Sequence, residues 1–289
     1  GFYSSATLVK DARRHGVRTR PVDLGCSQWR CVVEPDDSIR LGFCVVHGLQ
    51  EEHARELLAQ RAQRPFASID DFKMRVRLHK DELRALAEIG ALNALAAHRR
   101  DALWQAEREL LPEDDLFAEK VAQASSLPEV ARASSLPLEG DRTLEACATL
   151  RAMSPGERLQ ADYRIMSMST GPHPMALLRD RAPECWRARD LADVRTGLRV
   201  RIAGAVICRQ RPGTAKGFVF ISLEDETGIA NAIVTPAMFE RERLLITHER
   251  FLIIEGIAQN HEGVIHVRAE TITPLDAQDL AAAGSHDFR

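Results

Sequence analysis

The spacing of apolar residues changes to a period of two from Leu198 onward, and this change constrains the fold most strongly. Apolar and polar residues alternate there in short stretches that end at turn-forming residues. The expected strands are 198–208, 218–224, 229–234, 251–259 and 264–272. A helical stretch at 236–245 separates the third strand from the fourth. This order favours a closed barrel, because an open meander, the alternative, would leave strand edges exposed.

Five short strands with one helix after the third is the order of the OB fold, which we expect over 198–275, with a tail at 276–289. In OB folds, nucleic acid tracks across strands 2 and 3 and the loop that joins strands 1 and 2. That loop, 209–217, ends a stretch of five basic and no acidic residues that begins at Arg199. The candidate contacts in the loop are Arg209, Arg211 and Lys216.

The second expected strand offers aromatic contacts. Val219, Ile221 and Leu223 face one way along this strand, and Phe218 and Phe220 face the other. If the aliphatic set fills the barrel, both phenylalanines lie outside it, where aromatic rings can stack on bases. The alternative is that a neighbouring domain covers them.

A glycine-containing hairpin precedes a helix in the first half of the chain. Gly48-Leu49-Gln50 is followed by a stretch with an apolar stripe at Ala54 and Leu57. The pattern resembles a helix-hairpin-helix, in which backbone N–H groups and the helix dipole bind a DNA phosphate without reading bases. Gln50 stands where the motif has its second glycine, which weakens the expected approach of backbone to phosphate.

A second unit of the same kind follows. A capping-box-like start at Ser68 leads into helical stretches, and Ile89 to Asn93 form another hairpin around Gly90. The next helix carries Arg99 and Arg100 near its start. We therefore expect a tandem helix-hairpin-helix region at 41–111; a plain helical bundle with glycine turns is the alternative.

The remaining segments complete a multidomain α+β chain whose N-terminal half is mainly helical. A helix at 4–15 presents Lys10, Arg13 and Arg14 together, either as a DNA contact or as a solvated face. Residues 112–142 are acidic and repeat Ala-Ser-Ser-Leu-Pro, which favours an extended linker. Residues 143–197 are expected to form a helical connector.

The composition of the chain and the motifs that it lacks exclude several functions. Hydrophobic residues make up 45% and charged residues 28%, as in ordinary soluble proteins, and no apolar run is long enough to span a membrane. The six cysteines form no CxxC pair and are typical of reduced thiols, so we expect a cytoplasmic protein. No phosphate-binding loop, zinc-protease helix or paired catalytic aspartates occur, so we expect no catalytic, metal or cofactor site in this chain. The start at Gly1 suggests a piece of a longer protein.

The order of basic opening segment, tandem hairpins, connector and OB fold resembles the C-terminal part of bacterial C-family DNA polymerases, the DNA polymerase III alpha subunit type. Short strings bring the chain closer to the error-prone, damage-tolerance branch of that family. They are Gly1–Val17, Arg20–Asp23, Glu88–Leu92, Arg99–Trp104, Asp162–Arg164, His173–Met175 and Leu223–Gly228. The resemblance extends over nearly the whole chain outside the linker.

The resemblance implies a parent enzyme that extends primers across damaged templates with Mg²⁺ and deoxynucleoside triphosphates, in repair and induced mutagenesis. The family's catalytic aspartates match no position here, so the chain alone is expected to be inactive. Residues 1–40 would end the polymerase fingers, the hairpins would hold primer–template duplex, and the OB fold would hold single-stranded template. The implied partners are a Y-family-like accessory protein and, through it, the sliding clamp. A stand-alone RNA-binding OB protein is the alternative function.

Overall fold

The computed structural model describes residues 5–108, 150–261, 264–277, 280 and 286–287. The expected linker at 112–142 lies outside these residues. The chain divides into two compact units. We call them the barrel unit, which comprises 1–22, 30–47 and 153–289, and the helical unit, which comprises 23–29 and 48–152.

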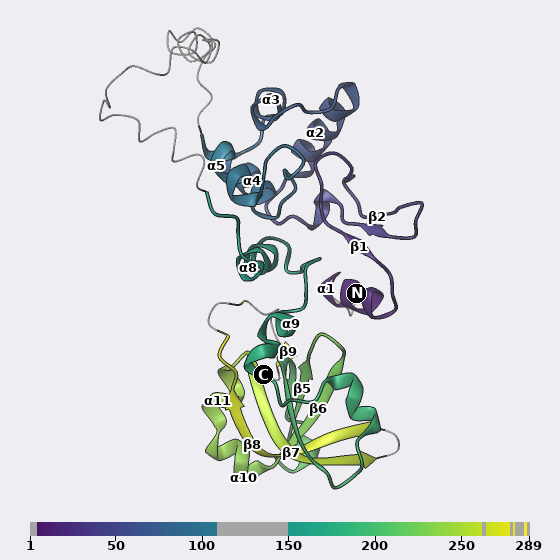
Figure 1. Cartoon of the computed structure of the whole chain (residues 1–289), viewed down its shortest axis with the longest axis vertical. Helices are drawn as coiled ribbons and strands as arrows, with labels where there is room; N and C mark the ends of the chain where they lie inside the picture. Colours follow the sequence, from purple (N-terminus) through teal and green to yellow (C-terminus); the bar gives the residue numbers. More distant parts are fainter. Residues whose placement is uncertain (1–4, 109–149, 262–263, 278–279, 281–285, 288–289) are drawn as a thin grey trace, which may run out of the picture. The chain divides into compact units, whose positions relative to one another are not determined.

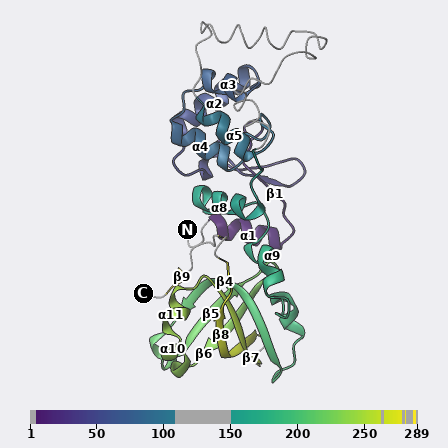
Figure 2. The same ribbon diagram turned by 60° about the vertical axis from the view of Figure 1, so that its left-hand side comes forward.

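The barrel unit contains a closed five-stranded barrel with OB-fold topology, as the sequence predicts (Figures 1 and 2). Its strands are β4 (Arg199–Gln210), β5 (Val219–Glu224), β6 (Ile229–Val234), β7 (Phe251–His261) and β8 (Val264–Pro274). They pair in the order β5-β6-β8-β7-β4, and β4 closes the barrel by pairing with β5. Only β6 and β8 run parallel among these five. The short β9 (His286–Asp287) adds to β4 in parallel.

The barrel is filled by the aliphatic side chains that alternate along its strands. Val219, Ile221 and Leu223 of β5 are buried in this core. The helices α10 (Pro236–Arg241) and α11 (Arg243–His248) lie beside the barrel strands (Figure 1). Their residues Met238, Phe239 and Ile246 belong to the same core. The helical stretch expected at 236–245 is therefore two short helices.

The rest of the barrel unit is built from helices and very short strands. These elements are α1 (Ser5–Arg14), β1 (Thr19–Arg20), β2 (Val32–Val33), β3 (Ile39–Arg40), α8 (Pro155–Met166) and α9 (Pro174–Leu178). Ser154 begins α8 with a capping box, since its hydroxyl accepts the N–H of Glu157 and the Glu157 carboxylate accepts the N–H of Ser154. His173 begins α9 by accepting the N–H of Met175. A 3-10 helix at Phe43–Val45 also belongs to this unit.

The described residues of the helical unit form four helices joined by short connecting segments. They are α2 (Glu51–Gln63), α3 (Ile69–Arg75), α4 (Lys80–Glu88) and α5 (Arg99–Glu107). The cap expected at Ser68 is present, because its hydroxyl accepts the N–H of Asp71 at 3.0 Å. Along the described residues no helix is both long and apolar enough to cross a membrane.

Candidate nucleic-acid interface

The two aromatic side chains that the sequence singled out lie at β5: Phe220 on its outer face, and Phe218 immediately before its first residue. Phe218 is 37% exposed and Phe220 is half-buried, whereas their neighbours Val219 and Ile221 lie fully inside the barrel. The alternation expected for this strand is therefore present. Phe220 pairs in register with Gln210 of β4 on one side and with Ile233 of β6 on the other.

Neighbouring strands extend this outer face with residues that the sequence did not single out. Ile233 pairs with Arg268 of β8, so a row runs from Phe220 through Ile233 to Arg268. A second row joins Ser222, Asn231 and His266, in which the Ser222 hydroxyl donates to Asn231 Oδ1 at 2.9 Å. The residues of β6 could have been found by extending the alternation from strand 2 to strand 3. The contribution of β8 requires knowledge that strands 3 and 5 pair.

Arg209 does not lie exposed in the loop, and this corrects the sequence-based expectation. It belongs to β4, is only 3% exposed, and donates to the backbone carbonyls of Ile246 and Glu249. The reason is an irregularity between Val206 and Cys208, which shifts the register and sets Arg209 opposite the buried Ile221. Its guanidinium therefore binds backbone carbonyls at the end of α11.

The other two basic residues of the loop lie at the surface. The Arg211 guanidinium stacks 4.5 Å from the centre of the Phe239 ring and lies 3.6 Å from a carboxylate oxygen of Glu240. Lys216 is exposed and has a left-handed backbone with φ of 49°. The loop therefore presents two cations, one of them held by an aromatic ring.

The basic face of α1 meets a carboxylate of the barrel. Lys10 Nζ lies 2.6 Å from Glu224 Oε2, and the Arg14 guanidinium forms an ion pair with the other oxygen. Arg13 donates to the carbonyl of Gly171 at 2.9 Å. The three basic side chains of α1 thus bind partners within the protein. They form neither a plain solvated face nor a set of cations free to contact DNA.

Glu224 is the centre of this contact and lies beneath a cavity of about 530 Å³. Its side chain is 4% exposed, and His173 Nε2 approaches to 3.5 Å. Burial opposes its ionisation, but the contacts with His173 and Lys10 outweigh burial and lower the pKa of Glu224 to about 2. Burial and the nearby Glu224 charge raise the pKa of Tyr163, which also lines the cavity, to about 12. Glu224 is therefore ionised at neutral pH.

The carboxylate of Asp225, the next along the chain, forms the tight turn that the sequence predicts. Asp225 Oδ1 accepts the N–H groups of Thr227 and Gly228, which makes the expected tight turn. Arg179 donates to Asp225 and Glu226, at 3.1 and 2.7 Å. The turn is thus tied to the residues that follow α9.

Both predicted hairpins turn at a glycine with a left-handed backbone, Gly48 with φ of 85° and Gly90 with φ of 83°. In the first hairpin, which includes Leu49, the N–H of Gln50 donates to the buried Glu82 at 2.9 Å. Two acidic residues, Glu51 and Glu52, occupy the first turn of α2. This hairpin is therefore a weaker phosphate-binding site than the sequence motif suggests, because the carboxylate of Glu82 already accepts the N–H of Gln50.

The second hairpin is packed by the helix that follows it. Arg99 lies so close to Gly90 that an added Cβ there would meet its Nε at 2.6 Å. The guanidinium of Arg99 donates to the carbonyl of Glu88, and that of Arg100 donates to the carbonyl of Arg151. Both arginines thus sit at the start of α5, as expected, and each is partly engaged by the backbone, but only Arg99 is shown to lie beside the turn.

Two family models match the chain in the regions just described. A helix-hairpin-helix motif matches residues 16–102, and an OB-fold nucleic acid binding domain matches residues 200–275. Both matches agree with the fold classes that the sequence predicts.

Relatives match over nearly the whole chain and carry the name error-prone DNA polymerase. The protein of Pseudomonas aeruginosa is 40% identical over 95% of this chain, and that of Burkholderia pseudomallei is 40% identical over 96%. The protein of Aromatoleum aromaticum is 38% identical over 100% of the chain. The chain spans about a quarter of the length of these relatives, 25–26%. Among solved structures, asparaginyl-tRNA synthetase from Pyrococcus horikoshii matches 27% of this chain and 20% of its own, at 29% identity and a TM-score of 0.24.

Proposed function

We propose that this chain, which is similar along nearly its whole length to one quarter of the error-prone DNA polymerases, is a DNA-binding part of such an enzyme. The barrel unit binds single-stranded template, and the helical unit contacts primer–template duplex. The parent enzyme extends primers across damaged template with Mg²⁺ and deoxynucleoside triphosphates, and its catalytic carboxylates belong to residues outside this chain. An accessory protein of Y-family type, and through it the sliding clamp, would be its partners.

The observation that carries the proposal is the outer face of β5, β6 and β8. Its row of Phe220, Ile233 and Arg268 combines an aromatic ring, an apolar side chain and a cation. Aromatic rings stack on bases of any sequence, and a cation beside them can meet the backbone phosphates. Arg211 and Lys216 supply further charge in the adjoining loop. The same face suits single-stranded RNA, so the nucleic acid must be decided by experiment.

For duplex DNA we assign the contact to the second hairpin, around Gly90, Arg99 and Arg100. Its backbone donors and arginines would meet phosphates without reading bases. The first hairpin contributes less, because Glu82 accepts from Gln50. Binding through this unit should therefore depend on salt and vary little with sequence.

The test is fluorescence anisotropy of the 289-residue chain with labelled single-stranded DNA over a range of salt concentrations. The double variant Arg211→Gln/Lys216→Gln should weaken binding to every sequence. The fall of log K with log salt should become shallower, by roughly 0.7 in slope for each phosphate that the variant no longer neutralises. Phe220→Ala should weaken binding by about 5- to 150-fold, the equivalent of ~1–3 kcal/mol, with little change in slope because stacking releases no counterions.

Matched controls separate this face from the rest of the barrel. Arg241→Gln removes an exposed arginine of α10, and Leu244→Ala removes an exposed apolar side chain of α11. Circular dichroism reports whether Phe220→Ala still folds. If the binding-face variants weaken binding no more than these controls, the assigned face is wrong. If single-stranded RNA binds more tightly than primer–template DNA, the RNA-binding alternative replaces the polymerase role.

A further inference from the structure

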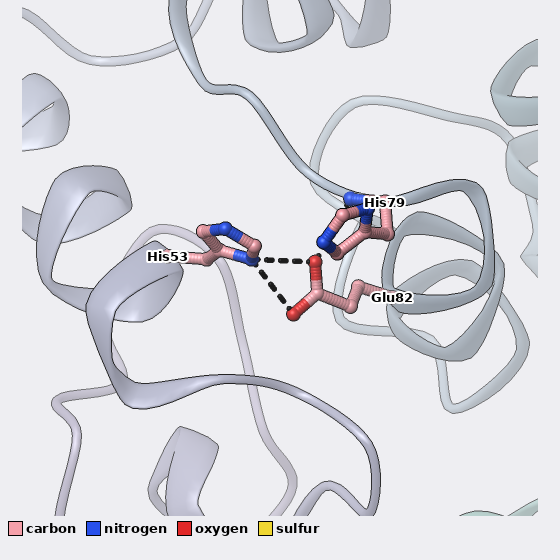
Figure 3. Close-up of side chains that lie close together, drawn as sticks. All are labelled: His53, His79 and Glu82. Atoms are coloured by element: carbon pink, nitrogen blue, oxygen red, sulfur yellow. Dashed lines mark hydrogen bonds and ion pairs between the residues drawn. The ribbon is translucent and has the colours of Figure 1, made fainter.

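Two histidines and a buried glutamate converge in the helical unit (Figure 3). His53 comes from the first turn of α2, His79 immediately precedes α4, and Glu82 lies in the first turn of α4. His53 Nδ1 lies 2.7 and 2.9 Å from the two carboxylate oxygens of Glu82. The two imidazole rings meet edge to face, with centres 5.1 Å apart. One nitrogen of each histidine and one oxygen of Glu82 lie within 4.8 Å of one another.

Two backbone N–H groups bind the carboxylate of Glu82 and hold it in place. The N–H of Gln50 donates to Oε1 at 2.9 Å, and the N–H of His79 donates to Oε2 at 2.8 Å. Burial opposes the charge of Glu82, but these two N–H bonds and His53 hold the pKa of its carboxyl below the usual range. Each carboxylate oxygen has a second lone pair, so the side toward the histidines can still accept a ligand.

We propose that His53, His79 and Glu82 bind a zinc ion. Two imidazoles and one carboxylate form a common donor set for zinc sites that keep an open position, whereas Mg²⁺ and Ca²⁺ prefer oxygen donors alone. The ion takes the place of the proton between His53 Nδ1 and Glu82, and the neutral ring carries its proton on Nε2. The backbone bonds from Gln50 and His79 then act as outer contacts that orient the carboxylate.

Binding the ion requires both imidazole rings to shift. Zinc ligands lie about 2.0–2.2 Å from the ion, so donor atoms around a tetrahedral zinc are about 3.3 Å apart. His53 Nδ1 and the nearer oxygen of Glu82 are 2.7 Å apart and would have to separate by about 0.6 Å, and the exposed His79 would have to turn toward them. Because His79 is exposed, the fourth position opens to solvent. The ion would tie the start of α2 to the start of α4 and so brace the first hairpin.

The experiment uses the full chain, stripped of metal with EDTA and exchanged into chelator-free buffer. Co²⁺ is titrated as a spectroscopic probe, and Zn²⁺ binding is measured by calorimetry and by displacement of Co²⁺. We expect one ion per chain and visible cobalt absorption without the near-ultraviolet band of thiolate ligation. This readout separates the site from the exposed cysteines Cys26, Cys31 and Cys44. Zinc should also raise the midpoint of thermal unfolding of the helical unit.

His53→Gln and His79→Gln should each weaken Zn²⁺ binding by at least about tenfold, because each removes a direct ligand. His47→Gln is the matched control, since this exposed histidine lies near the first hairpin in sequence but outside the cluster. Circular dichroism checks the fold of each variant. If Zn²⁺ does not bind one to one, if cobalt absorption shows thiolate ligation, or if both cluster variants bind like His47→Gln, the site does not exist.

Discussion

Glu224→Gln is the substitution that most directly tests the electrostatics of the barrel unit. The carboxylate of Glu224 pairs with Lys10 and Arg14 of α1 and lies near His173. The amide keeps the size of the side chain and can still form hydrogen bonds, but it carries no charge. Lys10 and Arg14 would then face each other without this counter-ion, beside a side chain that is only 4% exposed.

The size of the effect follows from the pKa of Glu224, about 2 in the folded protein against an ordinary value of 4.5. A lowered carboxylate pKa stabilises the folded state above the unfolded pKa, and the stabilisation is lost as the pH falls from 4.5 to 2. At pH 7 the full shift corresponds to about 3 kcal/mol of unfolding free energy. At pH 3 the same linkage leaves about 1.4 kcal/mol.

Urea unfolding followed by tryptophan fluorescence can isolate the barrel unit. Trp186 is its only tryptophan, since Trp29 and Trp104 belong to the helical unit and can be replaced by phenylalanine. In that background Glu224→Gln should lower the unfolding free energy by about 3 kcal/mol at pH 7 and by less than half of that at pH 3. Glu240→Gln, at an exposed carboxylate 3.6 Å from Arg211, should change it by less than about 0.5 kcal/mol.

Two results would refute this reasoning. A loss of the same size at pH 7 and pH 3 would mean that Glu224 acts through packing or hydrogen bonds and not through its charge. A loss at pH 7 no larger than that of Glu240→Gln would mean that α1 does not dock on Glu224 in solution.

Two further predictions concern residues whose roles the structure distinguishes. Gly48→Ala and Gly90→Ala should both lower the unfolding free energy of the helical unit by about 1–2 kcal/mol, because both backbones are left-handed. Gly90→Ala should cost about 0.5–1.5 kcal/mol more, because the side chains of Arg99 and Asn93 must move away from its Cβ, whereas that of Gly48 meets nothing within 4 Å; equal losses in urea unfolding would contradict the packing at Gly90. Arg209→Gln should destabilise the barrel by about 1–3 kcal/mol, because it leaves the buried carbonyl of Ile246 without its donor and removes the bond to the carbonyl of Glu249. Anisotropy should show that the folded fraction keeps its single-strand affinity, and a selective loss of binding would restore Arg209 to the interface.

Much of the fold could be predicted because it depends on local patterns. Alternation along β5 is a property of consecutive residues, so the buried set of Val219, Ile221 and Leu223 follows from the sequence alone. The turn at Asp225 was equally accessible, since its carboxylate bonds to residues two and three positions later. Arg209 was misplaced because the register shift before Cys208 leaves no mark in the pattern of apolar residues.

The contact between α1 and the barrel could not be predicted for a different reason. Lys10 and Glu224 are 214 residues apart, and the sequence contains 42 acidic residues that could face a basic helix. Periodicity identifies the basic face of α1 but carries no information on its partner. The choice depends on how the chain folds back, which only the structure provides.

The two hairpins show how a motif that repeats in sequence can differ in use. Both turn at a left-handed glycine, and neither has a second glycine two residues later, where Gln50 stands in the first hairpin and Leu92 in the second. The structure supplies the reason that position 50 does not need glycine. Its N–H donates to Glu82, 32 residues later, so a DNA phosphate would have to displace a buried carboxylate to reach it. A phosphate that did so would gain one hydrogen bond and leave Glu82 short of one, which costs more than it returns. We therefore propose that the first hairpin holds α2 and α4 together and that the second makes the contact with duplex DNA.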